Sequence, residues 1–159
     1  MLSDVRRRAA AIVAVSLLGL IAAACGGVRE QTQWDDDRTH GVSAIAGDIQ
    51  VRNALIVADE DGQQATLLAA FSNVGAEEDE LQRVVINGRE AEPEGGPLTI
   101  PAGSFARIDA EESRLDLQNI DTTPGLRTEV EFIFGSAPRA TASVLVLPNE
   151  GIYASVLGQ

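Results

Sequence analysis

The chain has 159 residues, with 24 acidic side chains against 12 basic ones and a net charge of −12. It contains one Cys, one His and one Met, which excludes an internal disulfide and a multi-cysteine zinc or iron–sulfur site. The acidic excess argues against a nucleic-acid partner, because phosphate binding needs clustered Lys and Arg. All 12 basic residues are Arg, which excludes lysine-based covalent catalysis.

The first 24 residues have the organisation of an export signal. Three arginines at positions 6–8 precede an uncharged, largely apolar run of 17 residues from Ala9 to Cys25. This run is shorter than the roughly 20 residues that a helix needs to cross a bilayer. Three alanines come directly before Cys25, the only cysteine, and two glycines follow it. The arrangement resembles the lipobox of bacterial lipoproteins and predicts a lipoprotein signal peptide over residues 1–24.

The lipobox resemblance implies that the Cys25 thiol carries a diacyl group, such as one built on palmitate, and that the signal peptide is removed. Two or more acyl chains hold a protein stably on a membrane, where a single chain does not. The predicted location is therefore the extracytoplasmic face of the cell membrane. The alternative is an uncleaved membrane anchor in which the cysteine has no role.

Removing the first 24 residues, whose net charge is +2, leaves −14 on the mature chain. An anionic lipid surface repels a body this acidic. We therefore expect the lipid on Cys25 to be the anchor and the domain to stand off the membrane.

Residues 25–47 predict a flexible tether, because they are polar and show no apolar periodicity. The segment contains the only Trp and the only His of the chain, Trp34 and His40. We expect Trp34 to fold back onto the domain or to rest at the lipid interface. With no second His and no Met beside it, His40 is not expected to bind a metal.

From Asp48 onward, short β-rich runs are separated by turn residues. Asp61-Gly62 and Asn87-Gly88 are hairpin signals, because glycine tolerates a positive φ. The spacing of the runs, without a convincing amphipathic helix, predicts an all-β fold. We expect a cupredoxin-like or immunoglobulin-like β-sandwich of about seven strands over residues 48–148. The predicted runs are 49–52, 54–58, 65–73, 81–86, 98–100, 104–108, 114–117, 126–134 and 140–147, with 74–80 and 89–97 as loops.

Aromatic residues make up only 4% of the chain, so the core is predicted to be aliphatic with a few bulky members. These bulky members are expected to be Phe71, Phe105, Phe132 and Phe134. The C-terminal tail, residues 149–159, contains apolar side chains but no clear pattern. It is expected either to add a last strand or to remain loose.

Four strings along the predicted sandwich occur in the order and spacing of a known family. They are Phe71-Ser72-Asn73, Asp79-Glu80-Leu81, Leu98-Thr99-Ile100-Pro101-Ala102-Gly103, and Pro124-Gly125 followed by Val130-Glu131-Phe132-Ile133-Phe134. Residues 48–148 therefore resemble the PCu(A)C-like copper chaperones. The resemblance implies an exported cupredoxin-like sandwich and, for the family, copper binding.

The family's copper site uses a His and a Met in mid-chain and a later His-x-Met. In the later segment, Arg114 stands at the position of the His and Asp116 at that of the Met. The stretch from Leu81 to Ser113 contains neither His nor Met. Cu(I) takes thioether, thiolate or imidazole ligands, whereas Arg is cationic and a carboxylate is a hard donor. We therefore expect a divergent member that keeps the sandwich and has lost the metal, with no cofactor.

Two acidic segments, 59–62 and 77–80, are predicted to be solvated hairpin tips. A calcium site is not expected in either, because neither contains the twelve-residue EF-hand pattern. An enzyme is not expected, because the only His lies in the tether. Paired carboxylates could perform glycosidase chemistry, but a cleft that binds sugars usually needs aromatic platforms, and this chain has few aromatic residues.

The sequence thus predicts a lipid-anchored β-sandwich lipoprotein that acts as a non-catalytic binding or interaction module. Its expected partners are the membrane, through the lipid on Cys25, and an unknown protein of the cell envelope. The alternative is a residual copper-binding, metal-delivery protein that recruits ligands from a partner or from His40.

Overall fold

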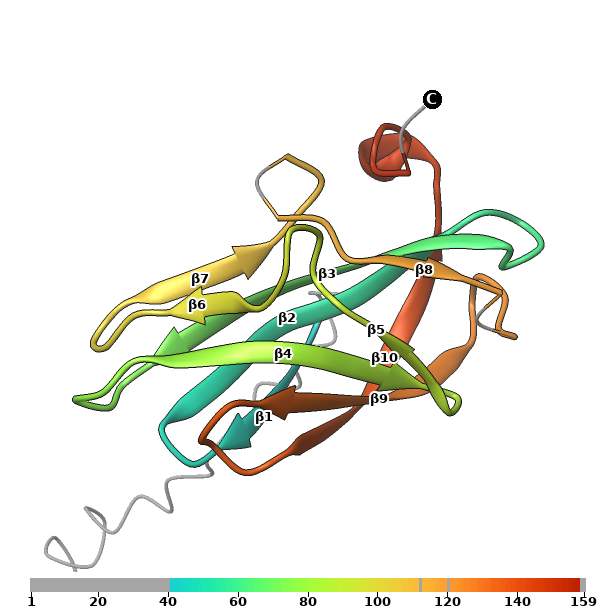
Figure 1. Cartoon of the computed structure of the whole chain (residues 1–159). Helices are drawn as coiled ribbons and strands as arrows, with labels where there is room; N and C mark the ends of the chain where they lie inside the picture. The colour runs from blue at the N-terminus through green and yellow to red at the C-terminus, as the bar shows by residue number, and fades with distance from the viewer. Residues whose placement is uncertain (1–40, 112, 120, 158–159) are drawn as a thin grey trace, which may run out of the picture. The chain divides into compact units, whose positions relative to one another are not determined.

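The computed structural model describes residues 41–111, 113–119 and 121–157, so the predictions on Cys25, Trp34 and His40 lie outside the described residues. The described part is built almost entirely of β-strands (Figure 1). It contains no helix with the length and apolar character needed to cross a membrane. The elements are β1 (Val42–Ala46), β2 (Ile49–Ala58), β3 (Gln64–Asn73), β4 (Asp79–Ile86), β5 (Arg89–Ala91), β6 (Leu98–Ile100), β7 (Phe105–Ile108), β8 (Asp116–Gln118), β9 (Arg127–Phe134), β10 (Ala140–Pro148) and the short 3₁₀-helix η1 (Gly151–Tyr153).

The strands form two sheets that β10 joins into one hydrogen-bonded system. Sheet A contains β1, β2, β3, β7 and β8, and sheet B contains β4, β5, β6 and β9. β10 pairs antiparallel with β9 over residues 140–145 and then parallel with β2 over residues 146–148. The two sheets share one hydrophobic core. The predicted all-β, cupredoxin-like sandwich is confirmed.

The core lies between the sheets, where inward apolar side chains alternate with outward ones along each strand. Phe71 of β3 meets Phe132 and Phe134 of β9 edge-on, with ring centroids 5.9 and 6.1 Å apart. These three predictions of bulky core members are confirmed. The fourth is wrong, because Phe105 is 69% exposed. Strand pairing places it opposite Ser72, on the outer face of sheet A.

β2 is one strand of ten residues with a bulge, where the sequence predicts two short runs. Asn53 has φ 52°, and β2 advances by one residue more than β3 between Arg52 and Leu55. The extra residue inverts the alternation of the strand. The inward residues are Ile49 and Val51 before the bulge and Ala54, Ile56 and Ala58 after it. Leu55 and Val57 consequently belong to a second apolar cluster outside the main core.

Two short strands lie in segments predicted to be irregular. β1 occupies residues 42–46, so the folded domain begins inside the predicted tether of residues 25–47 and not at residue 48. Ala44 and Ala46 supply much of its core contact, and such small side chains give a weak apolar pattern. β5 occupies three residues of the predicted loop 89–97 and pairs with β4 across the Asn87-Gly88 turn. The described residues therefore contain ten strands, where the sequence predicts about seven.

Over its described residues, 149–157, the C-terminal tail is folded but adds no strand. After β10 the chain forms η1 and a further turn. Val156 is 8% exposed and packs with Leu55 and Val57 of β2 on the outer face of sheet A. Tyr153 and Leu157 pack against the same cluster. The sequence left open a last strand or a loose tail, and the described part of the tail is neither, because it forms a short helix that packs on sheet A.

Candidate functional site

The residues singled out in the sequence fall at two opposite ends of the sandwich. The strings shared with the copper chaperones gather around Asn73, at the end of β3, and we call this region the Asn73 end. Arg114 and Asp116 lie beside the start of β3, where β8 pairs with residues 64–66, and we call this region the β8 end. β3 has ten residues, which separates the two ends by roughly 30 Å at about 3.3 Å per residue.

The Asn73 side chain organises the first of these ends. It is 2% exposed, and its Nδ2 donates to the carbonyls of Glu77, at 2.8 Å, and Ile100, at 3.1 Å. Its Oδ1 accepts from the backbone N–H of Gly75 at 2.9 Å. The buried Asn73 amide thus connects two positions of the β3–β4 loop, Gly75 and Glu77, with β6.

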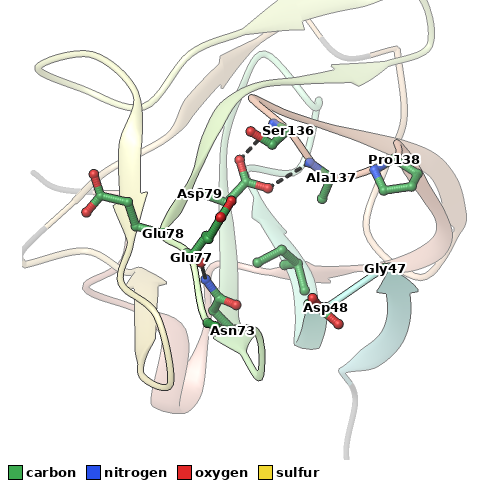
Figure 2. Close-up of a pocket in the computed structure, with 11 residues that line it drawn as sticks. Gly47, Asp48, Asn73, Glu77, Glu78, Asp79, Ser136, Ala137 and Pro138 are labelled. Carbon is green, nitrogen blue, oxygen red and sulfur yellow. Dashed lines mark hydrogen bonds between the residues drawn. The ribbon is translucent and has the colours of Figure 1, made fainter.

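Asp79 fixes the neighbouring turn. Its carboxylate accepts hydrogen bonds from the backbone N–H groups of Ser136, at 2.9 Å, and Ala137, at 2.8 Å, in the β9–β10 connection (Figure 2). It also accepts from the N–H of Glu80 at 2.8 Å. A buried or half-buried backbone N–H needs such a partner. Asp79 is therefore a structural carboxylate of the fold.

The Pro101-Ala102-Gly103 turn completes the Asn73 end. The Gly103 N–H donates to the Gly75 carbonyl at 3.2 Å, and the Asn73 N–H donates to the Ser104 carbonyl at 2.9 Å. Gly103 has φ 62°, a conformation in which a side chain is strained. Three of the four family strings are thus joined by hydrogen bonds at this end, where they determine the fold.

An open pocket of about 470 Å³ lies at the same end, between the β1–β2 turn, the β3–β4 loop and the β9–β10 connection (Figure 2). Asp48, Glu77, Glu78 and Asp79 line it. Among the residues that the structure describes, no group of three or more His, Cys, Asp or Glu is placed to hold a metal ion. The pocket wall is acidic, but Asp79 is already committed to the fold.

The other acidic segment, at residues 59–62, forms the tip of the β2–β3 hairpin. The Asp59 carboxylate accepts from the backbone N–H groups of Gln63, at 2.8 Å, and Gln64, at 3.2 Å. Gly62 has φ 65°, and a Cβ there would lie 2.0 Å from the Thr122 carbonyl oxygen. Asp59 thus closes its own turn, and Gly62 allows the tip to pack against the loop that follows β8.

At the β8 end, Arg114 and Asp116 form an ion pair. The Arg114 Nη2 lies 3.0 Å from the Asp116 Oδ1, and its Nε lies 3.4 Å from the Oδ2. The Oδ1 also accepts a hydrogen bond from the Thr66 hydroxyl at 2.7 Å. Thr66 is fully buried, whereas the Asp116 side chain is 54% exposed. The carboxylate is therefore held by the Thr66 hydroxyl on the neighbouring strand and by the Arg114 guanidinium.

Two pockets are lined by members of this ion pair, and a third adjoins one of them at Gln63 and Asn119. One of about 330 Å³ is lined by both of its members and by Leu157 of the tail. Two others, of about 520 and 290 Å³, extend from it past Asn119 and along β5. The walls are rich in carboxamides, which come from Gln63, Gln64, Gln118 and Asn119. Such a surface can hydrogen-bond a polar ligand or a protein loop.

Comparisons with known proteins identify the fold. No family model matches the sequence, and a search of curated proteins finds no match. Solved structures do match. The copper-bound PCuAC domain from PmoF2 aligns with a TM-score of 0.61 and 19% identity, over 67% of this chain and 98% of that one. The apo PCuAC domain from PmoF1 gives a TM-score of 0.61 and 18% identity, over 66% and 98%. The chain has a PCuAC-like fold.

A second structure of the PmoF2 PCuAC domain, without copper, also aligns, with a TM-score of 0.56, 17% identity, and 69% and 98% coverage. Each PCuAC domain is matched over almost its whole length. At these identities the likeness establishes the fold, and the chemistry of this PCuAC-like domain has to be argued from its own residues.

The family resemblance singled out Arg114 and Asp116, but the sequence predicted neither their ion pair nor the contact with Thr66. The hydroxyl and the carboxylate are 50 positions apart in sequence, and only the pairing of β3 with β8 joins them. The available signal was a polar residue inside the apolar run Ala65–Leu68, because a buried hydroxyl needs a hydrogen-bond partner. The carboxamides around the ion pair carried no signal of their own.

Proposed function

We propose that this chain is a lipid-anchored, extracytoplasmic binding protein without catalytic activity, whose PCuAC-like domain receives its ligand or partner at the β8 end. The observation that carries the proposal is the Arg114–Asp116 ion pair with its Thr66 support. By the family resemblance, these two positions belong to the later His-x-Met of the copper site. Here they form an oriented polar group with pockets on several sides.

The donor chemistry of this group does not suit Cu(I). A guanidinium repels a cation, and a carboxylate is a hard ligand for a soft ion. The sequence from residue 41 to 157 contains no His, Met or Cys. We infer that the β8 end binds through hydrogen bonds and charge.

Copper delivery is the second candidate, and the fold likeness supports it at least as strongly as it supports a metal-free module. One of the matched domains is copper-bound. A copper-delivering version of this chain would have to take ligands from His40 or from a partner protein.

A competition titration separates the two candidates. The mature chain with Cys25→Ser, which removes the only thiol, is titrated with Cu(I) and with Cu(II) at micromolar concentration. We expect no stoichiometric uptake of either ion. One tightly bound equivalent that disappears in His40→Ala would establish copper delivery instead.

A matched control shows that the titration is sensitive to this site. The double substitution Arg114→His with Asp116→Met places two soft donors at the β8 end and removes the ion pair. We expect it to bind Cu(I) more tightly than the parent chain, because imidazole and thioether are the ligands that this ion prefers.

The lipid anchor is tested separately in cells. Cys25→Ser in the full chain removes the acyl acceptor. We expect an unprocessed precursor or release of the protein into the medium, read by fractionation and mass spectrometry. Normal processing together with unchanged membrane retention would contradict the lipoprotein assignment.

A further inference from the structure

The outer face of sheet A is covered over only half of its length. At the β8 half, the C-terminal tail packs on Leu55, Val57 and Leu68. The half toward the Asn73 end contains two rows of outward side chains from paired residues on neighbouring strands, and no described segment packs over them as the tail does over the β8 half. One row is Ile45, Gln50, Ser72 and Phe105, and the other includes Arg52, Ala70 and Arg107. We call these seven residues the bare face.

The two largest apolar side chains of the bare face are solvent-exposed. Ile45 is 74% exposed on β1, and Phe105 is 69% exposed on β7. They stand at the two ends of one row across four neighbouring strands, which corresponds to about 14 Å at the usual strand spacing. Surface positions of this kind fit an occupant that presents a broad, flat and partly apolar layer.

The charge of the bare face differs from that of the chain. Its only charged side chains are Arg52 and Arg107, in a protein with twice as many acidic as basic residues. Arg107 pairs with Asp109, just beyond β7, at 2.6 Å, and Arg52 pairs with Gln50. The outward carboxylates of sheet B lie on the other side of the apolar core, and packed sheets are about 10 Å apart.

We propose that the bare face rests on the headgroup layer of the bilayer, with Phe105 and Ile45 entering the interface and the two arginines near lipid phosphates. The proposal rests on the proposed anchor at Cys25. β1 is both an edge of the bare face and the first strand after the predicted tether. The 16 residues between Cys25 and Val42 span at most about 60 Å, so the anchor keeps this face within reach of the membrane.

Because the tether holds the domain near the membrane, even a weak contact between the bare face and the bilayer can form. Two arginines and two apolar side chains alone would bind a bilayer only loosely. A short linker raises the effective concentration of the second contact to roughly the millimolar range. A second copy of the chain is a poorer occupant, because pairing two bare faces would place the arginines of one copy against those of the other.

The test uses the lipidated chain in vesicles of phosphatidylcholine and phosphatidylglycerol. Ser72→Cys provides a single thiol for a nitroxide at the centre of the bare face, because Cys25 is acylated. Ser143→Cys, at an exposed position of β10 that pairs with Glu129 of β9, is the matched control. The measured quantity is the ratio of accessibility to oxygen, which partitions into lipid, and to a water-soluble nickel chelate.

We expect a severalfold higher ratio at position 72 than at position 143, and a fall to the control value when Ile45→Ser and Phe105→Ser are combined. Equal, water-like ratios at both positions would overturn the proposal and leave the face to a protein partner. Dipolar broadening between position-72 labels would also overturn it, because it indicates pairing of two copies. Failure of the anchor itself is distinguishable, because the chain would then be missing from the vesicle fraction.

Discussion

Two aspartates, Asp79 and Asp116, show how the same side chain takes different roles at the two ends of the sandwich. Asp79 accepts three backbone N–H groups, one from its own strand β4 and two from the β9–β10 connection. Asp116 accepts from one buried hydroxyl and one guanidinium and keeps a half-exposed carboxylate. The first arrangement holds the fold, and the second leaves hydrogen-bonding capacity for a ligand.

This difference predicts a difference in stability. Asp79→Asn replaces a charged acceptor of three N–H groups by an amide, and we expect the free energy of unfolding to fall by about 1–3 kcal/mol. Asp116→Asn weakens a partly exposed ion pair, and we expect a loss below about 1 kcal/mol. Urea denaturation of the mature chain measures both. A larger loss for Asp116→Asn than for Asp79→Asn would contradict the assignment of roles.

The four phenylalanines show what a sequence reveals at the residue scale. Phe132 and Phe134 lie on one face of a cleanly alternating run, which predicts their burial correctly. Phe105 lies in the short run 104–108, which is compatible with either phase. Its orientation is decided by pairing with Ser72 on β3, a contact that local pattern does not contain.

Among the secondary-structure elements, the turns that contain glycine allowed the neighbouring strands to be predicted from the sequence. Asn87 and Gly88 have φ 49° and 78°, as the predicted hairpin requires, and they connect β4 to β5. The bulge at Asn53 and the strand β1 were not predictable in the same way. A bulge depends on the register between two strands, and β1 depends on small side chains packing beside β2.

The tail gives a prediction about an element. Val156 is 8% exposed against Leu55 and Val57, whereas Ile152 is 85% exposed. Val156→Ala removes the equivalent of two buried methylenes, and we expect the free energy of unfolding to fall by about 1.5 kcal/mol. Ile152→Ser is the matched control, with an expected change within about 0.5 kcal/mol. Equal effects of the two substitutions would show that the tail does not pack on sheet A as described.

For the whole molecule, the sequence predicted the fold better than it predicted the candidate site. The strings around Asn73 are joined by hydrogen bonds that hold the loops and strands of the sandwich together, so they predicted the fold well. The family resemblance singled out Arg114 and Asp116, but their ion pair, its Thr66 support and the surrounding pockets appear only in the structure, where β3 and β8 pair.

The distribution of charge also belongs to this scale. A net charge of −14 for the mature chain predicts that the domain stands off the membrane, which treats the charge as uniform. The structure places two arginines on the bare face of sheet A, one of which pairs with Asp109 just beyond β7. The sign of a local surface, within one Debye length, decides its contacts with a neighbouring layer.

We propose that the β8 end of this PCuAC-like domain does not bind Cu(I). The most direct measurement is a Cu(I) titration of the mature Cys25→Ser chain followed by ¹H–¹⁵N NMR, which locates any bound ion. We predict that the backbone amide signals of residues 63–66 and 114–119 stay unshifted at one equivalent. Stoichiometric shifts confined to these two segments would contradict the claim and establish a copper site at the β8 end.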